Sequence, residues 1–207
     1  MKYLISIIIL LIFQSCNKKE LSFEIEVKVH DKTFNQALAG AEITFFEFTP
    51  TSTIGNPVKE IKTNSEGKIE VKFEHKRILK YEVLIRKENY MPRRVIIYFD
   101  DLKPNEMNSF SYEIGAKTWF EFTFTKAPNT PTIQELKINK QGFLQNCDFC
   151  CPNGFEYHYG VENFSLNCET EAHQNILFFY WVNGNEDFGE YDIYTQPFDT
   201  IKINVVH

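Results

Sequence analysis

The chain of 207 residues has 22 Lys and Arg against 28 Asp and Glu, which gives a formal net charge of −6 at pH 7. Because this charge is mixed and mildly acidic, the sequence gives no basis for a nucleic-acid partner or for electrostatic binding to an anionic membrane. The 20 Phe residues, together with Tyr and Ile, favour β-structure and are expected to fill its core.

The first residues have the three-part pattern of a secretory signal. Lys2 precedes an apolar run, residues 4–13, and the small residue Ser15 stands just before Cys16. A membrane-spanning helix needs about 20 apolar residues, so this run is too short to cross a bilayer. We therefore expect export of the chain and removal of residues 1–15 as a signal peptide.

A Cys directly after the small residue makes this segment similar to a bacterial lipoprotein signal. Phe13 and Ser15 stand where that pattern usually has Leu and Ala or Gly. The resemblance implies that Cys16 becomes the mature N-terminus and carries a diacylglycerol and a further acyl chain such as palmitate. Such an anchor would hold the protein on a membrane of the cell envelope. The alternative is an ordinary secretory signal followed by an incidental Cys.

Residues 16–21 form a short lipidated tether in this reading, because strand-like patterning begins at Ser22. Five residues span at most about 15–18 Å, so the following domain would sit close to the bilayer. Asn17 is not the Asp that typically retains lipoproteins in the inner membrane, which favours the outer membrane, on its periplasmic face or at the cell surface. Lys18-Lys19-Glu20 is a faint version of the surface-export signal of Bacteroidetes-type bacteria.

Alternating apolar and polar residues predict a series of half-buried strands in the first half of the chain. Phe23, Ile25, Val27 and Val29, for example, form one apolar face. The turn at residues 64–67 ends in a Gly that can take a positive φ. The strands expected here cover residues 23–30, 38–46, 69–73, 81–85, 95–99 and 110–114.

This half resembles the carboxypeptidase regulatory-like, or transthyretin-like, β-sandwich. The matching features are Leu38-Ala39-Gly40-Ala41, Thr63-Asn64-Ser65-Glu66-Gly67, Tyr81 and Asn89-Tyr90, in the family's order. Ala37, Lys80 and Asn89 depart from the usual Pro, Gly and Gly. The resemblance implies a non-catalytic sandwich over residues 22–116 and says little about what that sandwich does.

A second β-rich domain, residues 117–207, is expected after the boundary at Gly115-Ala116-Lys117. Phe120, Phe122 and Phe124 alternate along its first strand, and Asn183-Gly184 between two apolar runs is a strong hairpin signal. Further strands are expected at 133–138, 176–182, 191–194 and 200–206. No stretch of twelve residues has helical periodicity, so the fold class predicted is all-β, with two tandem small β-sandwiches after the cleaved signal.

Four of the five Cys residues lie in a segment with little periodicity, residues 145–175, which is expected to be an insertion. They are Cys147, Cys150, Cys151 and Cys168. In an exported protein, four such Cys residues predict two disulfides. A bridge between adjacent Cys150 and Cys151 would strain the backbone, so each is expected to pair with Cys147 or Cys168. Closing a loop of about fifteen residues stabilises a fold by about 3 kcal/mol.

Zinc bound by Cys147, Cys150 and Cys168, with His158 or His173, is the alternative for this segment. Exported thiolates usually oxidise, so disulfides are favoured and no metal or other cofactor is expected. No motif of nucleophilic, metallopeptidase or phosphate-binding chemistry occurs in the sequence, so we expect no enzyme activity and no catalytic residues.

Aromatic residues of the second half allow a further interpretation. Trp119, Trp181, Tyr157 and Tyr159 would make a sugar-stacking platform if they were exposed, and core packing explains them equally well.

These observations favour a non-enzymatic, lipid-anchored cell-envelope protein that binds a partner protein at the outer membrane. The first alternative is a carbohydrate- or ligand-binding accessory of an outer-membrane transporter. A metal-dependent enzyme centred on the Cys segment is the third hypothesis.

Overall fold

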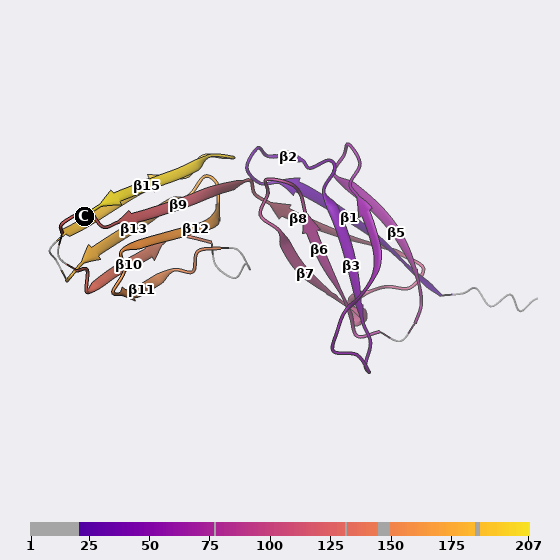
Figure 1. Ribbon diagram of the computed structural model, residues 1–207. Coiled ribbons are helices and arrows are strands. Elements are labelled where there is room, and N and C mark those ends of the chain that lie inside the picture. Colours follow the sequence, from indigo (N-terminus) through magenta and orange to yellow (C-terminus); the bar gives the residue numbers. More distant parts are fainter. Residues whose placement is uncertain (1–20, 77, 131, 145–149, 185–186) are drawn as a thin grey trace, which may run out of the picture.

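The computed structural model describes residues 21–76, 78–130, 132–144, 150–184 and 187–207. The predicted signal segment 1–15, Cys16, the tether up to residue 20 and Cys147 lie outside the described residues. Within the described ranges the regular elements are strands, apart from a short 3-10 turn at Phe99–Asp101. The strands form two groups that lie end to end (Figure 1), so the prediction of an all-β chain with tandem sandwiches is confirmed.

Two facing sheets build the first sandwich. In one sheet, β1 pairs with β2 and β5 in antiparallel fashion and with β8 in parallel fashion. The strands of this sheet are β1 (Ser22–Asp31), β2 (Gln36–Ala37), β5 (Lys68–Glu74) and β8 (Met107–Ile114). The other sheet is antiparallel in the order β4-β3-β6-β7. Its strands are β3 (Glu42–Phe48), β4 (Asn56–Lys62), β6 (Lys80–Arg86) and β7 (Arg93–Tyr98).

The apolar positions of the alternating strands fill the core between these sheets. Phe23, Ile25, Val27 and Val29 of β1 are buried, as the alternation predicts. They belong to one cluster with inward residues of the facing sheet, such as Tyr81. Side chains on successive strand positions point to opposite faces, so the polar residues of β1 lie on the outer face.

The strand expected at 38–46 begins later, at Glu42, because the chain bends at Gly40. Gly40 takes a left-handed φ of +71°, which a strand does not accommodate. Thr63 fixes the bend: its hydroxyl donates to the Leu38 carbonyl at 2.6 Å and accepts from the Ala41 amide at 2.9 Å. The predicted turn at 64–67 is confirmed, and Gly67 has a φ of +70°.

The second sandwich also has two sheets. In the first, β9 (Lys117–Thr125) pairs with β12 (Asn163–Glu171) and with β15 (Thr200–Val206). The second has the order β11-β10-β13-β14. Its strands are β10 (Glu135–Gln141), β11 (Gly154–Tyr159), β13 (Asn175–Val182) and β14 (Asp187–Tyr194). The hairpin predicted at Asn183-Gly184 is confirmed by the antiparallel pairing of β13 with β14.

The segment 145–175 is more regular than its sequence pattern indicates, because it contains β11 and β12. On β12, Phe164, Leu166 and Cys168 pack against the core and alternate with polar residues. On β11 the alternation is inverted. Its residues Glu156 and His158 point inward, and the neighbouring aromatic residues point outward. A pattern with aromatic side chains in the solvent does not match the usual rule for a half-buried strand.

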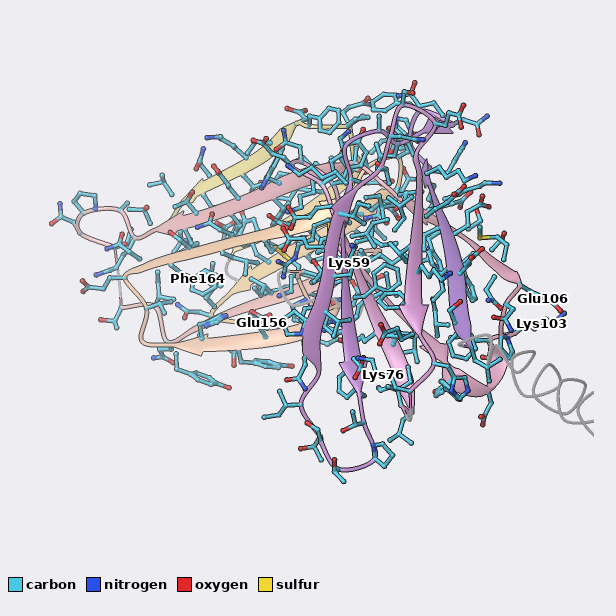
Figure 2. The ribbon with its side chains drawn as sticks, turned by 90° about the vertical axis from the view of Figure 1, so that its right-hand side faces the viewer. Lys59, Lys76, Lys103, Glu106, Glu156 and Phe164 are labelled. Atoms are coloured by element: carbon cyan, nitrogen blue, oxygen red, sulfur yellow. A yellow bond between two sulfur atoms is a disulfide. The ribbon has the colours of Figure 1, made fainter. Side chains whose placement is uncertain are left out.

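Inward-facing charges accompany this inversion at the edge of the sheet. Lys140 of β10 is fully buried and forms an ion pair with Glu156. His158 Nε2 lies 3.5 Å from the second oxygen of the Glu156 carboxylate. The His158 ring packs on Phe164, and Figure 2 marks Glu156 and Phe164 in this sandwich. A buried ammonium needs such a partner, because an unpaired charge in the interior is strongly destabilising.

The two sandwiches contact each other where β8 passes into β9. The Ala116 amide donates to the Thr33 hydroxyl at 2.7 Å, and the Ala172 amide donates to the Ala116 carbonyl at 2.9 Å. Ala172, which follows β12, packs into the core of the first sandwich. The Lys32 ammonium lies 2.9 Å from the Glu171 carboxylate across the junction. Backbone, side-chain and ionic contacts therefore all join the two sandwiches.

Candidate functional site

An exposed cluster of aromatic side chains covers the outer face of the sheet β11-β10-β13-β14. We call this surface the aromatic face. Its rings are Phe155, Tyr157, Tyr159, Phe179, Trp181 and Phe188, and Lys137 lies among them. These residues occupy the outward positions of four neighbouring strands, whose alternate positions fill the core of the second sandwich.

The sheet register places four members of this face in a line across the strands. Tyr157 of β11 is opposite Lys137 of β10, Lys137 is opposite Trp181 of β13, and Trp181 is opposite Phe188 of β14. We call these four residues the aromatic row. The Trp181 and Phe188 ring centroids are 5.3 Å apart.

Lys137 is the centre of the face. Its Nζ lies 4.5 Å from the ring centroid of Phe155, 4.8 Å from that of Trp181 and 5.7 Å from that of Tyr157. An ammonium near the faces of several rings is attracted by their negative π-surfaces. This attraction holds the Lys137 ammonium among the three rings.

Four rings of the face are exposed to solvent, and those of Phe179 and Trp181 are half-buried. The exposed fraction is 54% for Phe155, 49% for Tyr157, 69% for Tyr159 and 48% for Phe188. Single exposed apolar residues are ordinary, but a contiguous apolar patch on a folded protein marks a binding surface. The core does not require these rings, because inward residues such as Phe178 already fill it.

Polar residues are interleaved with the rings. In the row next to the aromatic row, Phe155, Asn139, Phe179 and Glu190 are successive partners across the same four strands. Glu135 lies opposite Tyr159. Carboxylates therefore lie beside the flat apolar areas of the face, and Glu135 and Glu190 together outnumber the single ammonium of Lys137. The Asn139 side chain is buried between Phe155 and Phe179.

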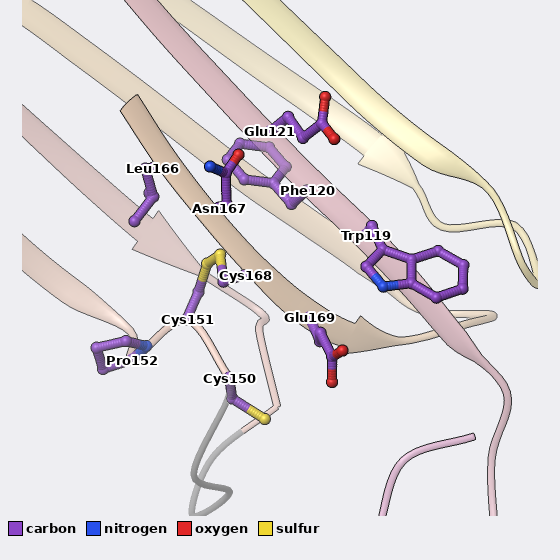
Figure 3. Close-up of a pocket in the computed structure, with 10 residues that line it drawn as sticks. All are labelled: Trp119, Phe120, Glu121, Cys150, Cys151, Pro152, Leu166, Asn167, Cys168 and Glu169. Atoms are coloured by element: carbon purple, nitrogen blue, oxygen red, sulfur yellow. A yellow bond between two sulfur atoms is a disulfide. The ribbon is translucent and has the colours of Figure 1, made fainter. Parts of the chain in front are cut away.

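A recess of about 480 Å³ lies on the other sheet, beside the Cys residues. Figure 3 shows Trp119 and Glu169 on one side of it and the Cys151–Cys168 disulfide on the other. The Glu169 carboxylate lies 2.7 Å from the Lys117 ammonium. In the described part of the chain, no group of three or more His, Cys, Asp and Glu residues is placed to hold a metal ion.

The disulfide expectation is confirmed for one pair. Cys151 and Cys168 are bridged, with their Cα atoms 5.3 Å apart. Cys150 is also disulfide-bonded. The sequence leaves Cys147 as its expected partner, a prediction that lies outside the described residues.

The alternative of a zinc site with Cys168 among its ligands is wrong. The sulfur of Cys168 bonds to Cys151 and offers no thiolate to a metal. The His158 ring packs against Phe164, and the His173 ring stacks at 6.0 Å on Tyr194.

Of the four aromatic residues singled out from the sequence, the structure brings three together. Trp181, Tyr157 and Tyr159 belong to the aromatic face, and Trp119 lies on the opposite sheet of the sandwich. Sequence reasoning missed Lys137, and it missed the rings of Phe155, Phe179 and Phe188. The available signal was the alternation of Phe155, Tyr157 and Tyr159, which indicates a strand with an aromatic side.

Among the described residues, none of the helical segments has the length and apolar character required to cross a membrane. This finding leaves the predicted lipid anchor at Cys16 untested.

Comparison with known proteins identifies no family: neither a family model nor a curated protein matches the sequence. The carboxypeptidase regulatory-like resemblance therefore stays a prediction. The fold and the site define the class of the protein: it is an all-β protein of two sandwiches, and one sheet has an aromatic outer face.

Among solved structures, the chain is similar to the Bacillus anthracis TIE protein, with 18% identity and a TM-score of 0.39 over 90% of this chain and 34% of that one. A Rhodococcus opacus 3-chlorocatechol 1,2-dioxygenase has 11% identity and a TM-score of 0.36, over 49% of this chain and 62% of the enzyme. The shaft pilin SpaA of Lactobacillus rhamnosus GG has 12% identity and a TM-score of 0.36, over 89% of this chain and 97% of the pilin. The chain thus spans about a third of the first protein and less than two thirds of the second. Likenesses this distant concern β-rich architecture and carry no argument about function.

Proposed function

We propose that this protein is a non-enzymatic, lipid-anchored binding protein of the cell envelope and that it binds its partner through the aromatic face. The observation that carries the proposal is the aromatic row, in which Lys137 lies between Tyr157 and Trp181, and Phe188 lies beyond Trp181, on an open sheet. A flat surface of this kind offers contact area and few reactive groups. Such a surface is suited to binding an extended partner.

The anchor is proposed from the sequence, through the lipoprotein-like signal that ends at Cys16. Two or more acyl chains on Cys16 would hold the protein stably on the outer membrane. Labelling of the full-length protein with a fatty-acid analogue tests this step. We expect incorporation in the wild type and in Asn17→Ala, and none in Cys16→Ala. Equal labelling of Cys16→Ala would contradict the anchor.

Binding through the aromatic face is tested with isolated cell-envelope material and the purified full-length protein. We expect the wild type to be retained on this material and Trp181→Ala to be released. Trp119→Ala is the matched control, because Trp119 belongs to the other sheet. Retention of Trp181→Ala at the wild-type level, or no retention of the wild type, would contradict the proposed binding surface.

A further inference from the structure

On the basis of the proposed binding role, we infer that the ligand of the aromatic face is a neutral carbohydrate chain. Its sugar rings would stack along the aromatic row of Tyr157, Trp181 and Phe188, with Lys137 between the first two. The inference depends on the shape of the face, on the polar groups interleaved with its rings, and on its charge.

The shape fits an extended ligand. Neighbouring strands lie about 4.8 Å apart, so the four strands spread the aromatic row over about 14 Å. Tyr157 stands at one end of this row and Phe188 at the other. Several rings in a line on an open sheet give a platform for successive units of a chain, whereas a single small molecule would use only part of it.

The chemistry of the face matches that of a sugar. A pyranose ring has an apolar face of C–H groups and a rim of hydroxyl groups. The C–H face can stack on rings such as Trp181, because aromatic side chains offer large, flat apolar surfaces. The hydroxyl rim requires hydrogen-bond partners beside the rings. The Glu190 carboxylate lies next to Phe179 in the adjacent row, and Glu135 lies opposite Tyr159.

The same polar groups disfavour a protein as the occupant. The buried centre of a protein interface is depleted of charged residues. Here Lys137 lies inside the row, and Glu190 lies in the adjacent row, two strands from Lys137. Covering these charges with an apolar protein surface would remove them from water without partners, which is costly. Sugar hydroxyl groups would supply partners and leave water at the rim.

The charge of the face selects among carbohydrates. Glu135, Glu190 and Asp192 are outward residues of the same sheet, against the single ammonium of Lys137. Like charges repel, so an anionic polysaccharide or a lipid phosphate is disfavoured at this surface. A neutral chain meets no such repulsion, and it can accept hydrogen bonds from Lys137 and donate them to the carboxylates.

A binding panel tests the ligand class. The probes are a soluble β-glucan, a mannan, a xylan and a polyuronate, with the full-length protein in detergent and affinity electrophoresis as the readout. We expect the wild type to bind at least one neutral polysaccharide and to ignore the polyuronate. Trp181→Ala is expected to weaken binding at least about tenfold, because it removes the central stacking ring. Trp119→Ala and the wild type should bind equally, and unchanged thermal unfolding shows that each variant is folded.

Treatment of the envelope material separates this inference from the proposed binding role. Periodate cleaves the vicinal diols of sugars, whereas a protease removes proteins. We expect Trp181-dependent retention to be lost after periodate and kept after protease. Loss after protease alone would overturn the carbohydrate inference and leave the binding role intact. Self-association that Trp181→Ala abolishes would assign the face to a second copy and overturn the inference too. Retention that does not depend on Trp181 would contradict both.

Discussion

The Tyr90 hydroxyl donates a 2.7 Å hydrogen bond to the Asp31 carboxylate at the junction of the two sandwiches. Asp31 is fully buried, and its other oxygen accepts from the backbone amides of Thr33 at 2.9 Å and Phe34 at 3.1 Å. The Tyr90 ring also contacts Phe198 of the second sandwich, with centroids 5.7 Å apart. One carboxylate therefore shapes the turn after β1 and positions a ring that both sandwiches share.

Removing this hydroxyl should destabilise the junction. In Tyr90→Phe, the buried Asp31 carboxylate loses a hydrogen-bond donor, so we expect the free energy of unfolding to fall by about 1–2 kcal/mol. Burial, and then the bond to Asp31, raises the pKa of Tyr90, so the hydroxyl remains a donor at neutral pH. Urea denaturation measures the change. Tyr98→Phe is the control, because the Tyr98 side chain is 56% exposed. Equal stability of Tyr90→Phe and the wild type would show that this bond is dispensable.

The acid stability of the first sandwich should depend on Glu26. The Lys68 ammonium, 2.5 Å from the Glu26 carboxylate, holds the pKa of Glu26 at about 2, against its ordinary value of 4.5. The folded state therefore favours the ionised carboxylate. The ionised Glu26 therefore adds to the free energy of unfolding. This stabilisation is fully present above pH 4.5 and is lost as the pH falls from 4.5 toward 2.

Thermal unfolding between pH 7 and pH 2 checks this dependence. Glu26→Gln should be less stable than the wild type at neutral pH, and the difference should shrink on acidification. Glu24→Gln serves as the control, because the Glu24 side chain is 45% exposed and lies 3.7 Å from its partner Lys72. Parallel stability profiles for Glu26→Gln and the wild type across this range would rule out the assigned role.

The Cys151–Cys168 disulfide should stabilise the second sandwich specifically. Its two residues are separated by 17 positions, and loop closure of this size contributes about 3 kcal/mol. The double variant Cys151→Ser with Cys168→Ser should therefore unfold at lower denaturant concentration. Tryptophan fluorescence is a selective readout, since both Trp residues of the chain, Trp119 and Trp181, lie in this sandwich. An unchanged fluorescence midpoint would exclude a stabilising role.

The strands that alternate in the ordinary way could be predicted from the sequence. On β1, the apolar residues from Phe23 to Val29 are buried, and on β9 those from Phe120 to Phe124 are buried, as their alternation predicts. The strand β11 lies in the segment 145–175, which was expected to be an insertion with little periodicity, and in this strand Glu156 points inward and Phe155 outward. An aromatic alternation does not show which side faces the core when the charged side has a buried ionic partner.

The candidate site was predictable only in part for a different reason. Lys137 lies on β10 and Trp181 on β13, far apart in the chain, and only the pairing register places them opposite each other. The register is set by which faces of many strands are buried together. Three of the aromatic residues could be named as a possible platform, but the position of Lys137 at its centre required the folded sheet.

The inward ion pair of β11 gives a last prediction, which links stability to the site. Lys140 is fully buried and depends on Glu156, so Glu156→Gln leaves an ammonium without a counter-charge. The Glu156 side chain is 31% exposed, so the pair is only partly buried, and breaking it should destabilise the protein by about 1–3 kcal/mol. Replacing both residues, as in Lys140→Met with Glu156→Gln, should recover most of this loss, because no buried charge then remains.

Tyr157 follows Glu156 on the same strand and belongs to the aromatic face. A strand loosened by Glu156→Gln should therefore bind polysaccharide more weakly, and the double variant should regain binding together with stability. Urea denaturation and affinity electrophoresis of the wild type, Glu156→Gln, Lys140→Met and the double variant measure the two effects. If the single substitutions were additive in the double variant, Lys140 and Glu156 would not act as a pair, and β11 would owe its position to other contacts.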